Sequence, residues 1–303
     1  MGLLGSGVRF QPPHRQRRDF SRAARRTEFQ IGEVRRPAVA GLFYPRAPDE
    51  LRTLVEGLLA EVHATPEPAT AAIVPHAGLI YSGRCAAEVF KRLQFPSTVV
   101  ILAPNHTGMV RAPGGASTWS RGVFQTPLGD ITVAEDFVSA LCAACPLVAH
   151  DPLAHAKEHA IEVELPFLSL LSPSTAIVPV VLAWDDWDRC RQLGEALAGV
   201  VRDWPEPVGL IASSDMTHFE SAASAEQKDH IALEHVAELD GEGLLDACRK
   251  HRISMCGRAP AAAVLEAARL LGAERGELVD YRNSGRVTGD EGHVVAYAGV
   301  TIR

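Results

Sequence analysis

Short apolar runs alternate with longer segments of helical periodicity along most of the chain. The runs at 71–74, 97–102, 176–182 and 208–212 have the length and composition of buried strands. Between them, segments such as 82–93 and 186–204 place apolar side chains along one helical face. This alternation predicts an α/β fold. No break in composition marks a second domain between residues 34 and 303, so one domain is expected there.

Three of the apolar runs are followed by a histidine. His76 comes after Pro75 at the end of the first run, His106 follows the second, and His218 closes the loop after the fourth. Ligands of open α/β sheets bind beyond the carboxyl ends of the strands, so three histidines at equivalent positions indicate one shared site. Converging imidazoles are typical of metal binding or proton transfer.

Composition narrows the classes of function. The chain has 303 residues, a net charge of -7 and 22% charged residues. A protein of this charge has no overall electrostatic attraction for nucleic acid, so we expect no nucleic-acid partner. Six cysteines occur without a secretory signal before them, which predicts reduced thiols, a cytoplasmic location and no membrane association.

Residues 1–33 differ from the rest of the chain. They are rich in arginine and poor in apolar side chains, which predicts a mobile arm outside the domain. Arg17-Arg18 resembles a twin-arginine export signal, but no apolar segment follows it. The first six residues fit the loose myristoylation pattern, which often matches by chance. We therefore interpret the segment as an arm.

A further motif is compatible with a zinc peptidase. His155, Glu158 and His159 match H-x-x-E-H, and on one continuous helix the two histidines would share a face. The third ligand would then be a downstream glutamate such as Glu226 or Glu234. The alternatives are that this segment lines the histidine site or that it is a solvated helix start.

The cysteines offer two candidate motifs. Cys142 and Cys145 have redox-motif spacing, but they end a predicted helix and lack a second pair for zinc, so we interpret them as structural. Cys256 lies beside Arg258, just before a helix that is predicted to begin near Pro260. A helix N-terminus and a cation favour the thiolate, which is a metal ligand or a nucleophile. The alternative is a small core residue.

Five motifs occur together in one order. They are Pro75-His76-Ala77-Gly78, Pro104-Asn105-His106, Glu158-His159 with Glu162, Ser213-Ser214-Asp215 with His218, and Cys256-Gly257-Arg258. In this combination the chain resembles the Memo family, whose bacterial and archaeal members are called AmmeMemoRadiSam system protein B. The resemblance extends from about Arg36 to the C-terminus. It implies a single α/β domain with a central mixed sheet flanked by helices, similar to class III extradiol ring-cleaving dioxygenases.

The resemblance also implies a metal site. In those dioxygenases two histidines and a carboxylate hold Fe²⁺ and leave positions open for substrate and oxygen. By resemblance, His76 and His106 are the two histidine ligands, and Cys256 stands where the dioxygenases have a glutamate. A thiolate is softer than a carboxylate and shifts the preference toward copper, zinc or a differently tuned iron. Iron or copper is the cofactor that the resemblance implies.

Three more residues receive roles from the resemblance. His218 resembles the second-sphere histidine that acts as acid and base in the dioxygenases. Asp215 and Glu158 would line the pocket and orient the imidazoles. These three are the expected catalytic residues.

Two hypotheses of function follow. The first is a cytoplasmic, iron- or copper-dependent oxidoreductase, with ring cleavage of a catechol-like substrate as a special case. The second is a scaffold on the same fold that binds a metal, a peptide or a small aromatic ligand without catalysis. Some Memo relatives are associated with tyrosine-phosphorylated peptides and with copper handling. The name of the system also suggests a radical S-adenosylmethionine protein as a partner.

Overall fold

The four apolar runs form neighbouring parallel strands in the middle of one sheet. The computed structural model describes residues 33–303, so the predicted arm lies outside the described residues except for its last one. The central strands are β2 (Ala71–Val74), β9 (Val208–Ser213), β3 (Thr98–Pro104) and β8 (Ala176–Leu182), in that spatial order. Strands β2 and β3 are buried at every position, as expected for a sheet covered on both faces.

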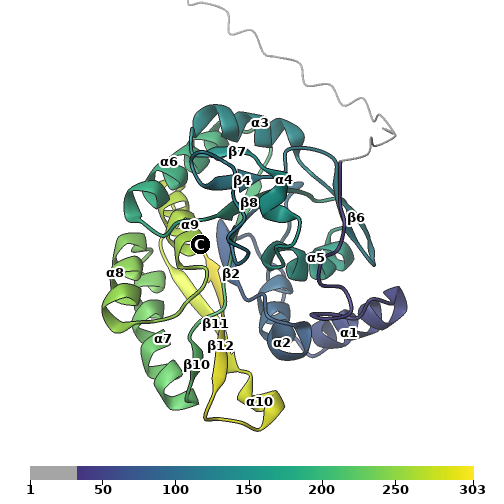
Figure 1. Ribbon diagram of the computed structural model, residues 1–303, viewed down its shortest axis with the longest axis vertical. Coiled ribbons are helices and arrows are strands. Elements are labelled where there is room, and N and C mark those ends of the chain that lie inside the picture. Colours follow the sequence, from purple (N-terminus) through teal and green to yellow (C-terminus); the bar gives the residue numbers. More distant parts are fainter. Residues whose placement is uncertain (1–32) are drawn as a thin grey trace, which may run out of the picture.

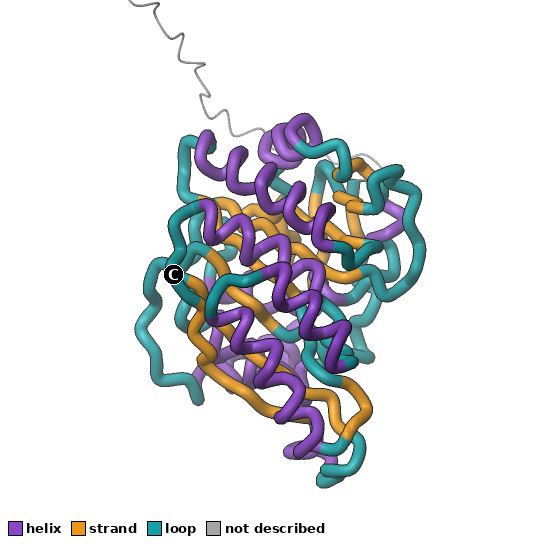
Figure 2. The backbone as a smooth tube through the Cα atoms, turned by 90° about the vertical axis from the view of Figure 1, so that its left-hand side faces the viewer, coloured by secondary structure: helices purple, strands orange, loops and turns teal. Residues whose placement is uncertain are grey.

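Antiparallel strands extend this core on both sides and make the sheet mixed. On one side β12 (Val294–Ile302) pairs with β2, and both β11 (Gly276–Asn283) and β10 (His218–Glu220) pair with β12. On the other side, β4 (Ala116–Thr118) pairs with β8 and with β7 (Val148–His150). A separate small sheet contains β1 (Val34–Arg35), β5 (Val123–Thr126) and β6 (Gly129–Thr132). Figure 2 shows the strands as a layer crossing behind the helices.

Helices cover both faces of the large sheet (Figure 1). One group contains α1 (Pro48–Ala60), α2 (Leu79–Phe90) and α5 (Ala160–Leu171), and the other contains α6 (Trp187–Asp203), α7 (Ala222–Ala237), α8 (Gly241–His251) and α9 (Arg258–Leu270). The remaining helices are α3 (Glu135–Ala144), α4 (Pro152–His155) and α10 (Gly285–Thr288). This arrangement confirms the predicted α/β fold with a central mixed sheet flanked by helices. Among the described helices, none has the length and apolar character needed to cross a membrane.

Helix α9 shows why the sequence fits this architecture. It is buried along nearly its whole length, and alanines supply most of its buried positions. Small side chains allow the helix to pack closely between the sheet on one side and α6 on the other. This packing places the start of α9 next to the carboxyl ends of β9 and β2.

One edge of the sheet therefore collects several chain segments. The parallel strands β2, β9 and β3 all end there, and α2 begins there after a short loop from β2. This is the edge at which the sequence predicts a site.

Candidate metal centre

Three imidazoles meet at the carboxyl edge of the sheet. They belong to His76 after β2, His106 after β3 and His159 directly before α5. Their ligand atoms all lie within 4.8 Å of one another. The ring centres of His76 and His106 are 5.1 Å apart, and those of His106 and His159 are 4.5 Å apart. The arrangement is one in which three nitrogen donors can face one metal ion.

The Cys256 thiol adjoins this cluster. Its Sγ is 3.3 Å from Nε2 of His76 and accepts a hydrogen bond of 3.2 Å from the backbone N–H of Asp215. The next residue, Gly257, packs so tightly against the end of β9 that a Cβ there would lie 2.2 Å from the carbonyl oxygen of Ser213. Glycine is therefore required at this position to hold the thiol beside His76.

Burial keeps the imidazoles of His76 and His159 neutral. Burial, with a smaller contribution from the neighbouring histidines, lowers the pKa of His76 well below its ordinary value. Burial also lowers the pKa of His159, to about 4. A neutral imidazole keeps the nitrogen lone pair that binds a metal, so both histidines are in the state that ligation needs.

The expectation that the Cys256 thiolate is favoured by its surroundings is wrong. The Arg258 guanidinium pairs with Asp185, with Nε at 2.9 Å from the carboxylate, and so does not stabilise a thiolate at Cys256. Burial, followed by the negative charge of Asp215, raises the pKa of Cys256 far above its ordinary value. A cation bound at the cluster would oppose both effects, because metal binding and thiol ionisation are coupled.

Glu158 orients two of the three histidines. Its carboxylate accepts hydrogen bonds from Nδ1 of His106 at 2.8 Å and from the backbone N–H groups of His159 at 2.8 Å and Ala160 at 3.0 Å. Burial opposes its ionisation, but the hydrogen bond from His106 and the charges around it outweigh burial and lower the pKa of Glu158. The bond to Nδ1 leaves Nε2 of His106 as the available donor.

Asp215 and His218 lie beside the cluster from the side of β9 and β10. Asp215 accepts from the backbone N–H groups of His76 at 2.9 Å and Ala77 at 3.2 Å, so it holds the loop that carries His76. Burial raises its pKa to about 6. His218 is partly exposed, and its Nδ1 lies 3.1 Å from the carbonyl oxygen of Ser254. A carbonyl only accepts, so Nδ1 carries the proton in this bond and Nε2 is left with a lone pair.

Residues 35–301 match the family model described as Memo-like protein. The chain belongs to the Memo family. A MEMO1 family protein of Methanopyrus kandleri is 40% identical over 89% of this chain and 99% of its own length. A MEMO1 family protein of Methanocaldococcus jannaschii is 38% identical over 90% of this chain and 100% of its own length. The crystal structure of an uncharacterized Escherichia coli K12 protein has a TM-score of 0.45 at 17% identity, covering 78% of this chain and all of that one.

This Memo-family protein is not built as an H-x-x-E-H peptidase. The predicted continuous helix is interrupted, because α4 ends at His155 and α5 begins only at Ala160. His155 is buried, and its Nε2 lies 3.0 Å from the carbonyl oxygen of Ser117, away from the cluster. Glu226 and Glu234 are exposed on α7.

The alternative of a solvated helix start is also wrong. Glu158 is 3% exposed and Glu162 is 0% exposed, and both carboxylates are hydrogen-bonded inside the protein. Glu162 pairs with Arg35 of β1, whose guanidinium also donates to the carbonyl oxygens of His155 and Glu158. The Memo-family protein thus ties its first strand to the turn that carries His159.

The predicted ligand set and the observed cluster overlap. His76, His106 and Cys256 lie together as expected, and their joint service as metal ligands stays a prediction. His159 is the residue that the sequence placed in the wrong motif. The available signal was its position directly after Glu158 and before an apolar helix, where a carboxylate can accept from the first free N–H groups.

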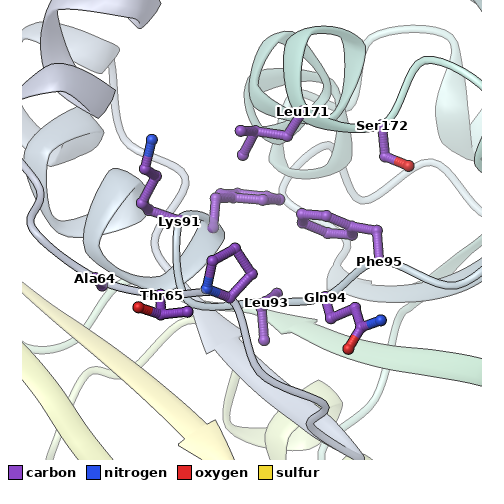
Figure 3. Close-up of a pocket in the computed structure, with 10 residues that line it drawn as sticks. Ala64, Thr65, Lys91, Leu93, Gln94, Phe95, Leu171 and Ser172 are labelled. Carbon is purple, nitrogen blue, oxygen red and sulfur yellow. The ribbon is translucent and has the colours of Figure 1, made fainter.

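One cavity of the Memo-family protein lies away from the cluster. A pocket of about 530 Å³ is lined by residues 64–66, 90–95 and 171–172. Figure 3 shows Lys91, Phe95 and Leu171 around it. It lies at the C-terminal ends of α2 and α5, whose N-terminal ends adjoin the cluster, so a helix length of about 18 Å separates the two.

Proposed function

We propose that this Memo-family protein is a metal-dependent oxidoreductase that holds iron or copper with His76, His106 and Cys256, with His159 as a further donor. The observation that carries the proposal is the set of three imidazoles with ligand atoms within 4.8 Å, together with a thiol 3.3 Å from one of them.

The donors suit a redox metal. Imidazole binds iron, copper and zinc, and a thiolate favours the softer of these ions. His76 is buried and neutral, which keeps its lone pair available, and the lowered pKa of Glu158 provides a negative charge beside the cluster. The side chain of His106 is 31% exposed, so the cluster is reachable from solvent.

Each surrounding residue has a defined task in this proposal. Bound iron or copper supplies electron transfer and open positions for a substrate or dioxygen. Glu158 orients His106 and the start of α5, and Asp215 holds the His76 loop. His218 accepts or returns a proton through Nε2, since its Nδ1 proton is engaged by Ser254.

A second candidate function is binding without turnover, which the apolar surroundings favour. Two apolar side chains near the site are exposed: Ile80 at 65% and Phe219 at 74%. Phe219 adjoins His218, and Ile80 lies in the first turn of α2 after His76. Such side chains suit a small molecule or peptide with an aromatic or aliphatic part. Oxygen consumption with any such compound would decide for catalysis.

The test is a metal analysis of protein purified anaerobically under reducing conditions. Mass spectrometry should find near-stoichiometric iron or copper in the wild type and a loss in His76→Ala and Cys256→Ala. The control is His63→Ala, which removes an exposed histidine outside the cluster and should leave the metal content unchanged. A wild type that holds no metal after reconstitution with either ion would overturn the proposal.

A further inference from the structure

Glu164 is a buried carboxyl group with no hydrogen-bond partner. It lies on α5, is 1% exposed, and neither Oε1 nor Oε2 is hydrogen-bonded to any of the described residues. Burial raises its pKa well above the ordinary value, while the Ser213 hydroxyl acts in the opposite direction. A carboxyl group is costly to bury in this way, so its presence calls for a function.

Ser213 connects this carboxyl group to the histidine cluster. Its Oγ is 2.8 Å from Nδ1 of His76 and 3.1 Å from the carbonyl oxygen of Ala160. Ala160 lies one turn before Glu164 on the same face of α5, so both flank the hydroxyl from one side. The Ser213 hydroxyl acts on the pKa of Glu164 and contacts His76, so it is the group that lies between the two.

The Ser213 hydroxyl can either accept from or donate to Nδ1 of His76. Only the first arrangement leaves Nε2 free to bind a metal. If Oγ accepts from Nδ1–H, Nε2 keeps its lone pair toward Cys256. If Oγ donates to Nδ1, the ring proton moves to Nε2 and blocks ligation. The Ala160 carbonyl holds the hydroxyl proton weakly, because it also accepts the helical hydrogen bond from the N–H four residues later. A second group that accepts a hydrogen bond from the Ser213 hydroxyl therefore decides which tautomer His76 adopts.

We propose that Glu164 is a positioning residue for His76, acting through Ser213 to keep the proton of His76 on Nδ1. Whether ionised or protonated, Glu164 has a carboxyl oxygen that can accept the hydrogen bond of the Ser213 hydroxyl. With its own hydrogen directed to Glu164, Oγ remains an acceptor toward Nδ1 of His76. The consequence for metal affinity rests on the proposed function, whereas the consequence for the imidazole tautomer does not.

The first measurement is the tautomer of His76, read from the ¹⁵N chemical shifts of histidine-labelled protein without added metal. We expect the Nδ1–H tautomer in the wild type and in Glu164→Gln, whose amide oxygen can still accept a hydrogen bond from the Ser213 hydroxyl. In Glu164→Leu and Ser213→Ala, the Nε2–H form should become populated. A His76 that keeps the wild-type tautomer in Glu164→Leu would overturn the inference.

The second measurement is a Co²⁺ titration of the same variants. Loss of a group behind a histidine ligand typically costs about 10–100-fold in affinity, so Glu164→Leu should bind about tenfold more weakly and Glu164→Gln close to the wild type. The matched control is Thr301→Val, which removes another buried, unpartnered polar group. Thr301 lies on β12 opposite Ala72 of β2, four residues before His76. This control variant should not alter Co²⁺ affinity.

The two measurements separate the two proposals. A wild type that binds no Co²⁺ would count against the metal centre, and the tautomer of His76 would still decide the role of Glu164. Equal Co²⁺ affinity in the wild type and Glu164→Leu would contradict the role of Glu164 and leave the metal centre in place.

Discussion

Replacing Arg35 with methionine should destabilise the fold strongly. Arg35 and Glu162 form an ion pair in which both side chains are at most 1% exposed. Removing one partner of a buried pair costs about 3–5 kcal/mol, because the other charge is left uncompensated. Glu162 would keep three donors, which are the N–H groups of Ala38 and Val39 and the hydroxyl of Tyr44. We therefore expect a loss near the lower limit, about 3 kcal/mol.

Urea unfolding at constant pH measures this loss. The matched control is Arg249→Met, which breaks an ion pair with Asp246 whose side chains are more than half exposed. It should leave the free energy of unfolding unchanged within error, because exposed pairs contribute little. The double variant Arg35→Met/Glu162→Gln should recover part of the loss, since a neutral amide needs no counter-charge. The reasoning is refuted if Arg35→Met unfolds at the same urea concentration as Arg249→Met.

The remaining predictions concern three other buried positions. Burial raises the pKa of Asp229 above its ordinary value of 3.8, so the folded state holds this proton more tightly than the unfolded state. Relative to Asp229→Asn, the wild type should gain stability as the pH falls from the raised pKa toward 3.8, measured by urea unfolding at successive pH values. Glu164→Leu should raise the free energy of unfolding by about 1–3 kcal/mol, because it removes an unpaired buried carboxyl; a loss of stability in thermal and urea unfolding would contradict this. Gly257→Ala should cost about 1–3 kcal/mol and weaken Co²⁺ binding, since its Cβ would meet the Ser213 carbonyl and displace Cys256. Unchanged stability and affinity in that variant would show that the backbone there yields easily.

The convergence of His76, His106 and His218 could be predicted from the sequence. Each follows a short apolar run, and parallel strands bring their carboxyl ends to one edge of the sheet. The runs are adjacent in the observed sheet, in the order β2, β9, β3. The apolar pattern was sufficient because buried runs that alternate with helices favour neighbouring parallel strands.

His159 and Glu164 could not be assigned from the sequence for a different reason. Their positions depend on where α5 begins. That start is held by the Glu158 carboxylate, which accepts from the N–H groups of His159 and Ala160, and by the distant Arg35 guanidinium. Arg35 is 127 residues from Glu162, and no local pattern relates the two. The sequence therefore predicted one continuous helix with His155 and His159 on the same face, whereas α4 and α5 are separate.

The position of β12 has a consequence for how the protein folds. This strand follows all the others along the described chain, yet it lies inside the sheet, with Val300 beside Ile73 of β2. Contacts between such distant segments form slowly, because a long loop must close before they yield any stability. Until β12 arrives, β2 presents an open apolar edge to other chains, the kind of surface on which aggregation begins. The strand that delivers His76 is thus among the last to be enclosed, and the histidine cluster is expected to assemble late in folding.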